Sequence, residues 1–452
     1  MLDPKVLRDD LDRAIRGMRL RGDEQAERSV RDAAAADRQR RQRIQEVEVL
    51  RARRNEVSQA IGLAKREGRD AADEIRAMRD VARQIKLLDQ QLRGVEEAMS
   101  EALLHVPNIP DERVPPGEEG SGPVLSEFGT KREGDIPPHW EIGEAVAGPG
   151  SRAPVLDLAR GAKVSGSGFV FLTGGGARLS RALIQFMLDL HTAEHGYLET
   201  APPLMVSRAS LTATGHLPKF EDDVYRTDPD DLFLVPTAEV PLTSMHAGEI
   251  LDGDDLPLAY VAHTPCFRRE AGAAGRDTRG MLRVHQFDKV ELVRLCRPEH
   301  TIDQLELLTR HAERVLELLE LPYRRVLLPA GDLGFANAIT YDLEVWAPGV
   351  GNWLEVSSCS SYTDFQARRG MIRFRRETGQ RPELVHTLNG SALALARIIV
   401  ALLENGYHGS GEVLLPTVLH PYLGFDKLEP INTAAGSKPE YASQTQTGQP
   451  GT

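Results

Sequence analysis

The stretch that decides the fold reads Cys266-Phe267-Arg268-Arg269-Glu270 and continues, after a glycine-rich segment, with Arg283-Val284-His285-Gln286-Phe287 and Glu291. Two such runs joined by a glycine-rich segment predict a β-hairpin, and the loop from Ala271 to Gly280, with Arg276 and Arg279, is expected to be mobile. Burying charged residues in strands is costly unless a ligand or partner compensates. Arginine suits a polyanion because its planar guanidinium donates bidentately to phosphate oxygens. The hairpin therefore predicts an anion site, although a single strand arginine is more often half of a surface ion pair.

Other apolar runs around this hairpin indicate the fold class. They include Leu258–Ala262, Val284–Arg294 and Leu354–Val356. These predicted strands are paired in sequence or separated by loops, and they do not alternate regularly with helices. The pattern favours an α+β fold with an antiparallel sheet over a doubly wound parallel sheet.

Two further segments carry polar groups that fit phosphate chemistry. Glu355-Val356-Ser357-Ser358-Cys359 is expected to place Glu355 on one strand face with Ser357 and Cys359, and a carboxylate with a hydroxyl can hold magnesium on a triphosphate. Small residues from Asn389 lead into an apolar helix that brings Arg397 beside the sheet. The chain has no Walker, Rossmann or zinc-type spacing, so these signals are weak when taken singly.

The N-terminal part predicts two long helices from about Ser29 to Leu104, because aromatic residues are almost absent and helix formers dominate. In each half, mostly apolar residues recur at spacings of three and four, which keeps one seam facing a partner helix. The seams are Val47, Leu50, Arg54, Val57, Ile61 and Ala64, and Met78, Val81, Ile85, Leu88, Leu92, Val95 and Met99. Gly68 can end the first helix and Asp70 can cap the second, which predicts an antiparallel hairpin about 50 Å long. A coil between two chains is the alternative.

Charge is unevenly distributed along the chain, whose net charge is −12. Residues 1–105 are nearly balanced, so the acidic excess belongs to the rest. The expected tip of the hairpin is basic, with Arg51, Arg53, Arg54, Lys65, Arg66 and Arg69 against Glu56 and Glu67. The pattern predicts a nucleic-acid surface, and a solvated helical face is the alternative.

Composition divides the chain and excludes some classes of protein. Prolines and glycines cluster after residue 106, which predicts a helical domain over 1–106, a linker over 107–136, a second domain over 137–428 and a disordered tail over 429–452. No apolar run reaches the roughly 20 residues of a membrane helix, and the N-terminus lacks the apolar core of a secretory signal. These features predict a cytoplasmic protein. Cys266, Cys296 and Cys359 are expected to be reduced, buried thiols.

Taken in order, three segments resemble the signature motifs of class II aminoacyl-tRNA synthetases. They are Gly196-Tyr197 through Pro202-Pro203, Phe267-Arg268-Arg269-Glu270, and Gly390 to Arg397. Three further segments resemble seryl-tRNA synthetases of the bacterial type: Thr214–Phe220, Pro236–Thr243 and His285–Glu291. The predicted N-terminal helical hairpin resembles the same family. The resemblance covers residues 1 to about 428. It implies an antiparallel sheet flanked by helices and a homodimer built around Pro203.

The resemblance also implies an activity and a set of site residues. L-serine would be activated with ATP and Mg2+ to seryl-adenylate and transferred to the 3' end of tRNA(Ser), with tRNA(Sec) as a further substrate. The implied serine site is Thr237, Ala238, Glu239, Arg268, Glu291, Asn389 and Ser391. The implied ATP site is Arg268, Arg269, Glu270, Val284, Phe287, Glu355, Val356, Ser357, Ser358 and Arg397. Glu355 and Ser358 would hold the metal, while Arg268, Glu355 and Arg397 are the implied catalytic residues. Arg51, Arg54, Lys65 and Arg66 would contact tRNA.

Two departures from the family pattern leave alternatives open. Ala392 follows Ser391 where many relatives have glycine, and Ala396 precedes Arg397 where glycine or proline is frequent. Both changes exchange one small residue for another, so the fold is expected to be unaffected. A paralogue with altered catalysis or inhibitor sensitivity remains an alternative. An amino acid:carrier-protein ligase is another, for which the long basic hairpin would be absent or reduced.

Overall fold

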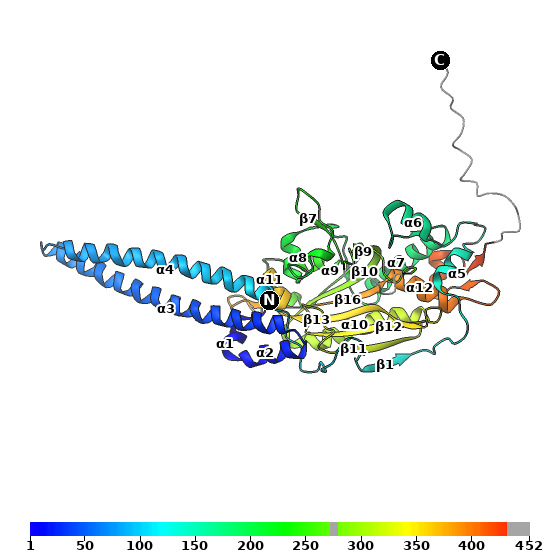
Figure 1. The fold of residues 1–452 in the computed structure, drawn as a ribbon, viewed down its shortest axis with the longest axis horizontal. Coiled ribbons are helices and arrows are strands. Elements are labelled where there is room, and N and C mark those ends of the chain that lie inside the picture. Colours follow the sequence, from blue (N-terminus) through cyan, green and yellow to red (C-terminus); the bar gives the residue numbers. More distant parts are fainter. Residues whose placement is uncertain (272–278, 432–452) are drawn as a thin grey trace, which may run out of the picture. The chain divides into compact units, whose positions relative to one another are not determined.

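The computed structural model describes residues 1–271 and 279–431 of the 452-residue chain. The described residues form two compact units (Figure 1). The first comprises Met1–Gly120 and Pro329–Ala338, and the second contains the rest. Arg276 and most of the expected tail therefore lie outside the described residues.

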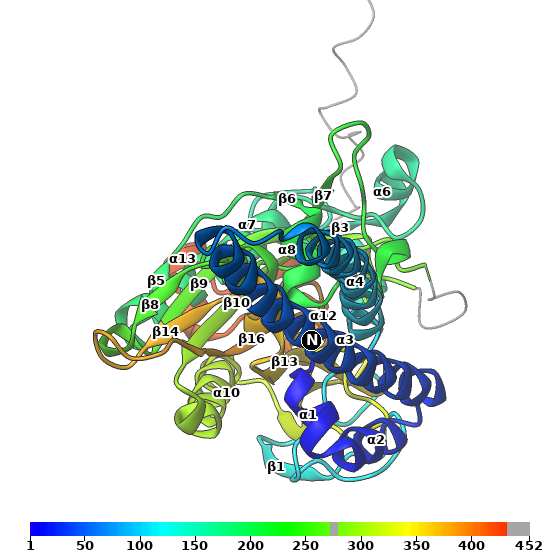
Figure 2. The ribbon, with the colours of Figure 1, turned by 90° about the vertical axis from the view of Figure 1, so that its left-hand side faces the viewer.

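The first unit is dominated by two long helices, α3 (Glu24–Arg66) and α4 (Ala72–Leu104), which lie side by side in both ribbon views (Figures 1 and 2). The predicted seams are confirmed, because every seam position is buried or half-buried except Arg54, which is exposed. Helix α3 begins earlier than expected because the Asp23 side chain accepts a hydrogen bond from the Ala26 N–H at 2.8 Å. Two short helices precede it, α1 (Pro4–Asp9) and α2 (Leu11–Leu20).

The turn between α3 and α4 has the predicted chemistry. Gly68 has a φ of +72°, a left-handed conformation that glycine adopts without steric cost. The Asp70 carboxylate accepts a hydrogen bond from the Ala72 N–H at 3.0 Å, which satisfies one free donor at the start of α4. Because the turn is this short, the two helices must run antiparallel within one chain.

Arg21 joins three segments of the first unit. Its guanidinium donates to the carbonyl oxygens of Asn108 at 2.8 Å, Leu333 at 2.9 Å, Gly334 at 3.2 Å and Asn337 at 2.5 Å. Burial lowers the pKa of Arg21 to about 10. This arginine attaches residues 329–338, which are distant in sequence, to the N-terminal helices.

The second unit is built on an eight-stranded sheet in which all neighbouring strands are antiparallel except β5 and β9. In order across the sheet the strands are β1 (Val124–Phe128), β11 (Tyr323–Leu327), β12 (Ile339–Ala347), β13 (Asn352–Thr363), β16 (His386–Ala394), β10 (Gln286–Cys296), β9 (Leu258–Phe267) and β5 (Leu198–Glu199). The predicted α+β class and antiparallel sheet are confirmed.

Helices flank this sheet, and small sheets surround it. The helices are α5 (His139–Ala145), α6 (Leu158–Ser165), α7 (Gly175–Ala193), α8 (Arg208–Thr214), α9 (Glu239–Ser244), α10 (Thr301–Leu318), α11 (Phe365–Gly370), α12 (Leu395–Gly406) and α13 (His420–Leu423). The small strands are β2 (Val146–Ala147), β3 (Leu156–Asp157), β4 (Phe171–Leu172), β6 (Met205–Ser207), β7 (Leu232–Leu234), β8 (Ile250–Asp252), β14 (Arg373–Arg375), β15 (Glu383–Leu384), β17 (Val413–Leu414) and β18 (Lys427–Pro430).

One face of the sheet is closed by close packing against α10. A Cβ atom at Gly390 would lie 2.4 Å from Leu308 of α10 and 2.9 Å from the Cys359 sulfur, so any larger residue would displace these two buried side chains. Gly390 on β16 pairs with Leu292 on β10, and paired residues share a face. The next residues along β16, Asn389 and Ser391, therefore point to the opposite face.

The expected boundaries differ from the structure at two places. The segment predicted as a linker contains β1, whose five residues are all exposed and therefore show no alternation of apolar and polar residues. At the other end, β18 continues to Pro430 and pairs with β17 and β2. The ordered chain therefore extends beyond residue 428. All three cysteines are buried, as predicted.

We expect Arg21→Ala to lower the free energy of unfolding of the first unit by about 2–3 kcal/mol, because it removes a charged donor from four carbonyl groups. Arg16→Ala, on the exposed side of α2, is the matched control. All three tryptophans belong to the second unit. Urea unfolding followed by far-UV circular dichroism should therefore show the loss, while tryptophan fluorescence should not. Equal circular dichroism transitions for the two variants would contradict this role.

Candidate active site

The hairpin predicted from the sequence is formed by β9 and β10. Phe267 pairs with Gln286, and the Arg268 N–H donates to the His285 carbonyl oxygen at 2.9 Å. The Arg268 guanidinium lies 5.2 Å from the centre of the Phe287 ring. The strand ends therefore place one fixed cation beside one aromatic face.

A buried polar cluster lies on the open face of β10 and β16. Glu291 accepts from the Asn389 amide at 2.7 Å and from the Ser391 hydroxyl at 3.3 Å. The Lys289 ammonium lies 2.5 Å from the same carboxylate. Tyr362 donates to the Asn389 carbonyl oxygen at 2.8 Å and so fixes the orientation of that amide. This geometry brings together three residues that the sequence predicted for one pocket.

Glu239 enters this cluster from α9. Its carboxylate accepts from the amides of Gln366 at 2.6 Å and Asn389 at 2.9 Å. Its own N–H donates to the Thr237 hydroxyl at 3.2 Å, and the Ala238 side chain between them is fully buried. The predicted segment from Thr237 to Glu239 therefore lies against the β10–β16 pair.

Burial sets the electrostatics of both carboxyl groups. It raises the pKa of Glu239 and of Glu291, and the positive charge of Lys289 opposes the rise in both cases. Two buried carboxylates beside an amide and a hydroxyl have the chemistry to bind a small ligand that carries an ammonium group and a hydrogen-bonding side chain. A bound cation would return both pKa values toward the ordinary range.

The expectation that Glu355, Ser357 and Cys359 share one face is wrong. On β12, Glu344 pairs with Glu355 but its neighbour Leu343 pairs with Ser357, so β13 contains one extra residue at this point. Paired residues share a face and neighbours alternate, which puts Glu355 and Ser357 on opposite faces. No alternation rule applied to the sequence could show this bulge.

The bulge separates the two roles expected of this segment. Ser357 is buried and donates to the Ser391 carbonyl oxygen at 2.6 Å, and the Val356 side chain is also buried. Glu355 is exposed, and its carboxylate lies 3.3 Å from Arg397 at the start of α12. Glu355 therefore shares a face with Ser358, while Ser357 serves the framework.

The oxygen donors on this face fit a magnesium ion held on a phosphate. Ser358 pairs with Asp342 and Glu355 with Glu344, so a hydroxyl and three carboxyl groups share one side of β12 and β13. Among the described residues, no group of three or more His, Cys, Asp or Glu side chains has the geometry to hold a metal alone. Magnesium usually takes one or two protein oxygens and completes its shell with phosphate and water, which agrees with both observations.

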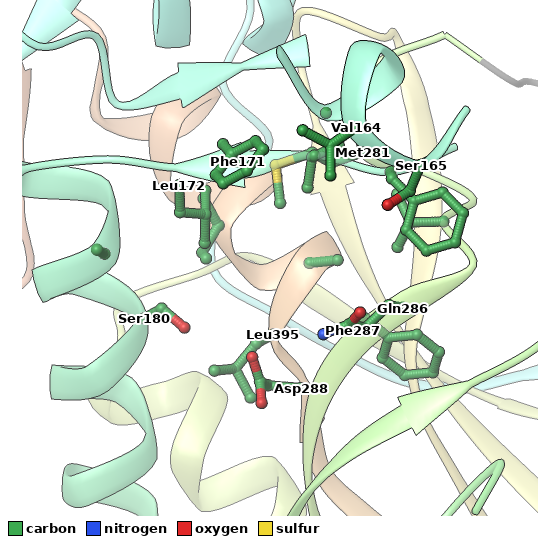
Figure 3. A pocket seen from close by; sticks show the side chains of 17 residues that line it. Val164, Ser165, Phe171, Leu172, Ser180, Met281, Gln286, Phe287, Asp288 and Leu395 are labelled. Atoms are coloured by element: carbon green, nitrogen blue, oxygen red, sulfur yellow. The ribbon is translucent and has the colours of Figure 1, made fainter. Parts of the chain in front are cut away.

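The remaining predicted ATP residues lie around the β9–β10 hairpin. The Arg269 N–H donates to the Asp223 carbonyl oxygen at 2.8 Å, and Glu270 accepts from the Arg283 guanidinium at 3.1 Å. Val284 and Phe287 line a cavity of about 410 Å³ with residues of α6, β4, α7 and α12 (Figure 3). This cavity also contacts Gln286 and Asp288, but neither Glu239 nor Glu291 lines it. It is therefore distinct from the pocket of Glu239 and Glu291.

The sequence did not single out three residues that complete the polar pocket: Lys289, Tyr362 and Gln366. Gln366 is fully buried, donates to Glu239, and accepts from the Thr387 hydroxyl at 2.7 Å. Lys289 carried a detectable signal, since it lies two residues before Glu291 in a predicted strand and therefore on the same face. Gln366 and Tyr362 carried none, because their role depends on where α11 and β13 pack.

The basic residues predicted to contact tRNA at the tip of the helical hairpin belong to α3 in the first unit. Arg54, Lys65 and Arg66 are exposed. The Arg51 guanidinium lies 3.3 Å from the Asp89 carboxylate across the two helices, which partly neutralises it. The tip therefore carries at least three exposed bases within a short stretch of helix.

Comparison with known proteins identifies the family. The seryl-tRNA synthetase N-terminal domain matches residues 1–110, and the class II core domain of tRNA synthetases (G, H, P, S and T) matches residues 219–406. A serine–tRNA ligase of Gemmatimonas aurantiaca is 53% identical over 427 residues, which is 94% of this chain and 99% of the relative. The chain belongs to the seryl-tRNA synthetase family. A relative from Exiguobacterium sibiricum, also a serine–tRNA ligase, is 50% identical over 94% of this chain and 98% of its own length.

Solved structures of seryl-tRNA synthetases share the fold. The enzyme of Pyrococcus horikoshii, complexed with ATP, has a TM-score of 0.90 at 37% identity and covers 95% of this chain and 100% of its own. The cytoplasmic serine–tRNA ligase of Naegleria fowleri, in complex with AMP, has a TM-score of 0.84 at 25% identity and covers 96% of this chain and 99% of its own.

Within residues 1–271 and 279–431, no helix is both long and apolar enough to cross a membrane.

His216, which is buried near Arg268, Lys289 and Glu291, makes the stability of the protein sensitive to acid. Burial, with the positive charges of Arg268 and Lys289, lowers the pKa of His216 from 6.5 to about 4. Between these values the unfolded chain binds a proton that the folded chain does not, so stability falls as the pH decreases. At pH 5 the loss from this residue should be about 2 kcal/mol relative to pH 7.

Urea unfolding of wild type and His216→Gln at pH 7 and pH 5 measures this loss. The variant should lose about 2 kcal/mol less than wild type between the two pH values. His408→Gln removes an exposed histidine and should behave like wild type. An identical pH dependence for His216→Gln and wild type would refute the assignment.

Proposed function

We propose that the chain is a serine–tRNA ligase that activates L-serine with ATP, forms seryl-adenylate, and transfers serine to the 3' end of tRNA(Ser). The observation that carries the proposal is the convergence of Glu239, Glu291, Asn389 and Ser391 into one buried pocket. Its carboxylates, amide and hydroxyl group suit the ammonium and hydroxyl groups of a small amino acid. Family membership supports the same conclusion. Retention of the long basic hairpin disfavours the carrier-protein ligase alternative.

Serine would be recognised through both its charge and its hydroxyl group. The carboxylates of Glu239 and Glu291 would bind the ammonium group, and Asn389 or Ser391 would exchange a hydrogen bond with the substrate hydroxyl. A site built to bond a hydroxyl rejects an analogue that lacks it, because its buried polar groups are left unpaired. Alanine should therefore be a poor substrate.

Adenylate formation requires charge stabilisation and alignment, and no covalent intermediate with the protein. The serine carboxylate would attack the α-phosphate in line, forming the new P–O bond as the bond to pyrophosphate breaks. Arg268 would neutralise charge on the α-phosphate, while Arg397 would bind the γ-phosphate. Phe287 would stack on adenine, supported by Glu270 and the backbone at Val284. A relative solved with ATP supports nucleotide binding in this fold.

Magnesium would be the metal, with Glu355 and Ser358 as its protein ligands. When bound, such an ion neutralises phosphate oxygens and orients the leaving group. Arg397, whose guanidinium lies 3.3 Å from the Glu355 carboxylate, would supply a second positive charge to the phosphate chain. Val356 and Ser357 would act by holding β13 in register.

A homodimer built on the segment around Pro203 is part of the proposal. Several large apolar side chains near this segment are exposed in the single chain, among them Leu198, Leu204 and Met205. Exposed apolar residues gathered along one stretch are typical of a protein interface. Sedimentation velocity should therefore give twice the mass of one chain.

Glu291→Gln should raise the KM for serine about tenfold or more in serine-dependent pyrophosphate exchange and leave the KM for ATP nearly unchanged, because it removes a charged partner of the amino group. Wild type should also show a rising serine KM as the pH falls, since burial raises the pKa of Glu291 and only its ionised form attracts the ammonium.

Asp288→Asn is the matched control for this experiment, because Asp288 lies three residues before Glu291 on β10, faces the other side of the sheet, and has its carboxylate 2.8 Å from His263 Nε2. It should change neither KM. Parallel increases for serine and ATP in Glu291→Gln would show that Glu291 is wrongly placed.

The helical hairpin of α3 and α4 is proposed to bind tRNA(Ser), with tRNA(Sec) as a further substrate. Replacing residues 34–98 with a short Gly/Ser linker should leave serine-dependent pyrophosphate exchange near normal, because the two seams pack against each other within the first unit. Aminoacylation of tRNA should collapse. Normal charging by the deletion variant would reduce the hairpin to a structural element.

Removing the positive charges at the tip of the helical hairpin tests whether these side chains contact tRNA directly. Changing Arg51, Arg54, Lys65 and Arg66 to Gln should weaken tRNA binding and flatten its salt dependence by a slope of roughly one per lost phosphate contact. Changing Glu56 and Glu67 to Gln at the same tip is the matched control and should not weaken binding. Equal affinities for wild type and the fourfold variant would indicate a solvated face.

A further inference from the structure

Glu404, near the end of α12, is fully buried and binds four N–H groups. One carboxylate oxygen accepts from the His139 backbone N–H and from the His139 ring Nδ1, both at 3.0 Å. The other accepts from the backbone N–H groups of Gly349 at 2.8 Å and Val350 at 3.1 Å. A buried carboxylate is costly unless every lone pair is used, and this one joins α5, the turn between β12 and β13, and α12.

The hydrogen bonds of His139 fix its protonation. Its Nε2 accepts from the Met281 backbone N–H at 3.0 Å, so Nε2 carries no proton. Nδ1 therefore carries the proton and donates it to Glu404. The ring is fully buried and neutral, and it acts as a rigid spacer between the carboxylate and the backbone of Met281.

Met281 lies shortly before β10. Two residues of α12, one near each end of the helix, fix the position of this segment. At the start of α12, Arg397 donates from Nε to the Leu282 carbonyl oxygen at 3.2 Å. Near its end, Glu404 reaches the Met281 N–H through His139. The two contacts fix the N–H group of Met281, to which His139 is the acceptor, and the carbonyl group of Leu282, to which Arg397 is the donor.

The packing beside Met281 shows that this contact is tight. A Cβ atom at Gly280 would lie 2.0 Å from His139 Nε2, and Gly280 has a φ of +77°. Only glycine combines that backbone conformation with so close an approach. The Arg279 guanidinium lies 4.7 Å from the ring centre of Trp140, the neighbour of His139.

We propose that His139, held by Glu404, is a positioning residue for ATP, which sets residues 281–284 so that Val284, Phe287 and Arg397 meet the nucleotide together. The proposal rests on the proposed function. His139 touches no substrate, and its effect passes through the Met281 N–H. The serine pocket is independent of this path, because Glu239, Glu291 and Asn389 are held by Gln366, Lys289 and Tyr362.

Two substitutions test the two hydrogen bonds of the His139 ring one at a time. His139→Asn keeps a donor near the position of Nδ1 but offers Met281 no acceptor. His139→Gln can place its amide oxygen near the position of Nε2 and so accept from Met281. Both replace the imidazole ring with an amide, and they differ in which of the two hydrogen bonds that amide can keep.

Serine-dependent pyrophosphate exchange at varied ATP and varied serine is the assay. His139→Asn should raise the KM for ATP about tenfold, because a buried donor is left unpaired, while the KM for serine stays within about twofold. His139→Gln should keep the KM for ATP within about threefold of wild type. Ile142→Val, a buried packing change on α5, controls for general loosening and should change neither KM.

Hydrogen exchange provides a second measurement. The amide of Met281 should be protected in wild type and in His139→Gln but should exchange faster in His139→Asn. If His139→Asn does not fold, Glu404→Gln takes its place, since it weakens the acceptor that orients the ring and should raise the KM for ATP alone. Equal KM values for ATP in the Asn and Gln variants, or parallel increases for serine, would overturn the proposal. Absence of serine-dependent exchange in wild type would instead overturn the proposed function.

Discussion

The second unit depends on one constraint, which is the burial of two carboxyl groups, Glu239 and Glu291, in the open face of a β-sheet. Neither side chain can be buried without donors, and the donors come from β10, β16 and α11. Asn389 is central because its amide nitrogen lies 2.9 Å from one carboxylate and 2.7 Å from the other. The fold must bring these elements together before the pocket exists.

Register shifts determine which side chains reach this face. β13 carries one extra residue opposite Leu343 and Glu344, and β16 carries one opposite Val290 and Glu291. The first shift places Glu355 on the same face as Ser358 and puts Ser357 on the opposite face. The second places the extra residue at Ala392, so that Ser391 still pairs with Glu291. Each bulge adds only one residue, but it changes the face of the sheet toward which the neighbouring side chains point.

The opposite face of the sheet provides rigidity. Gly390 admits α10 to close contact, and α12 links the start of β10 to α5 through Arg397, Glu404 and His139. The unit therefore pairs a polar open face, where charge is compensated by hydrogen bonds, with a tightly packed closed face. In the first unit, the corresponding long-range link is Arg21, which binds residues 329–338 by donating to their carbonyl oxygens.

Features that depend on neighbouring residues could be predicted from the sequence. Heptad spacing located the helical hairpin, Gly68 and Asp70 located its turn, and the arginine-bearing runs located the β9–β10 hairpin. The sequence also indicated the antiparallel sheet and most residues of the pocket, the latter through resemblance to a family. These features were accessible because helix periodicity, capping and hairpin pairing are set over a few residues.

Other features depend on how distant segments of the chain pack together. This packing placed β1 in a segment predicted as a linker, put Glu355 and Ser357 on opposite faces, and brought Lys289, Tyr362 and Gln366 into the pocket. It also joined His139 to Glu404 and Met281 across more than a hundred residues. An edge strand with five exposed residues has no periodic signal, and a bulge changes the face of a side chain without changing its sequence neighbours. A buried hydrogen bond between distant segments depends on packing, which no local pattern of residues encodes.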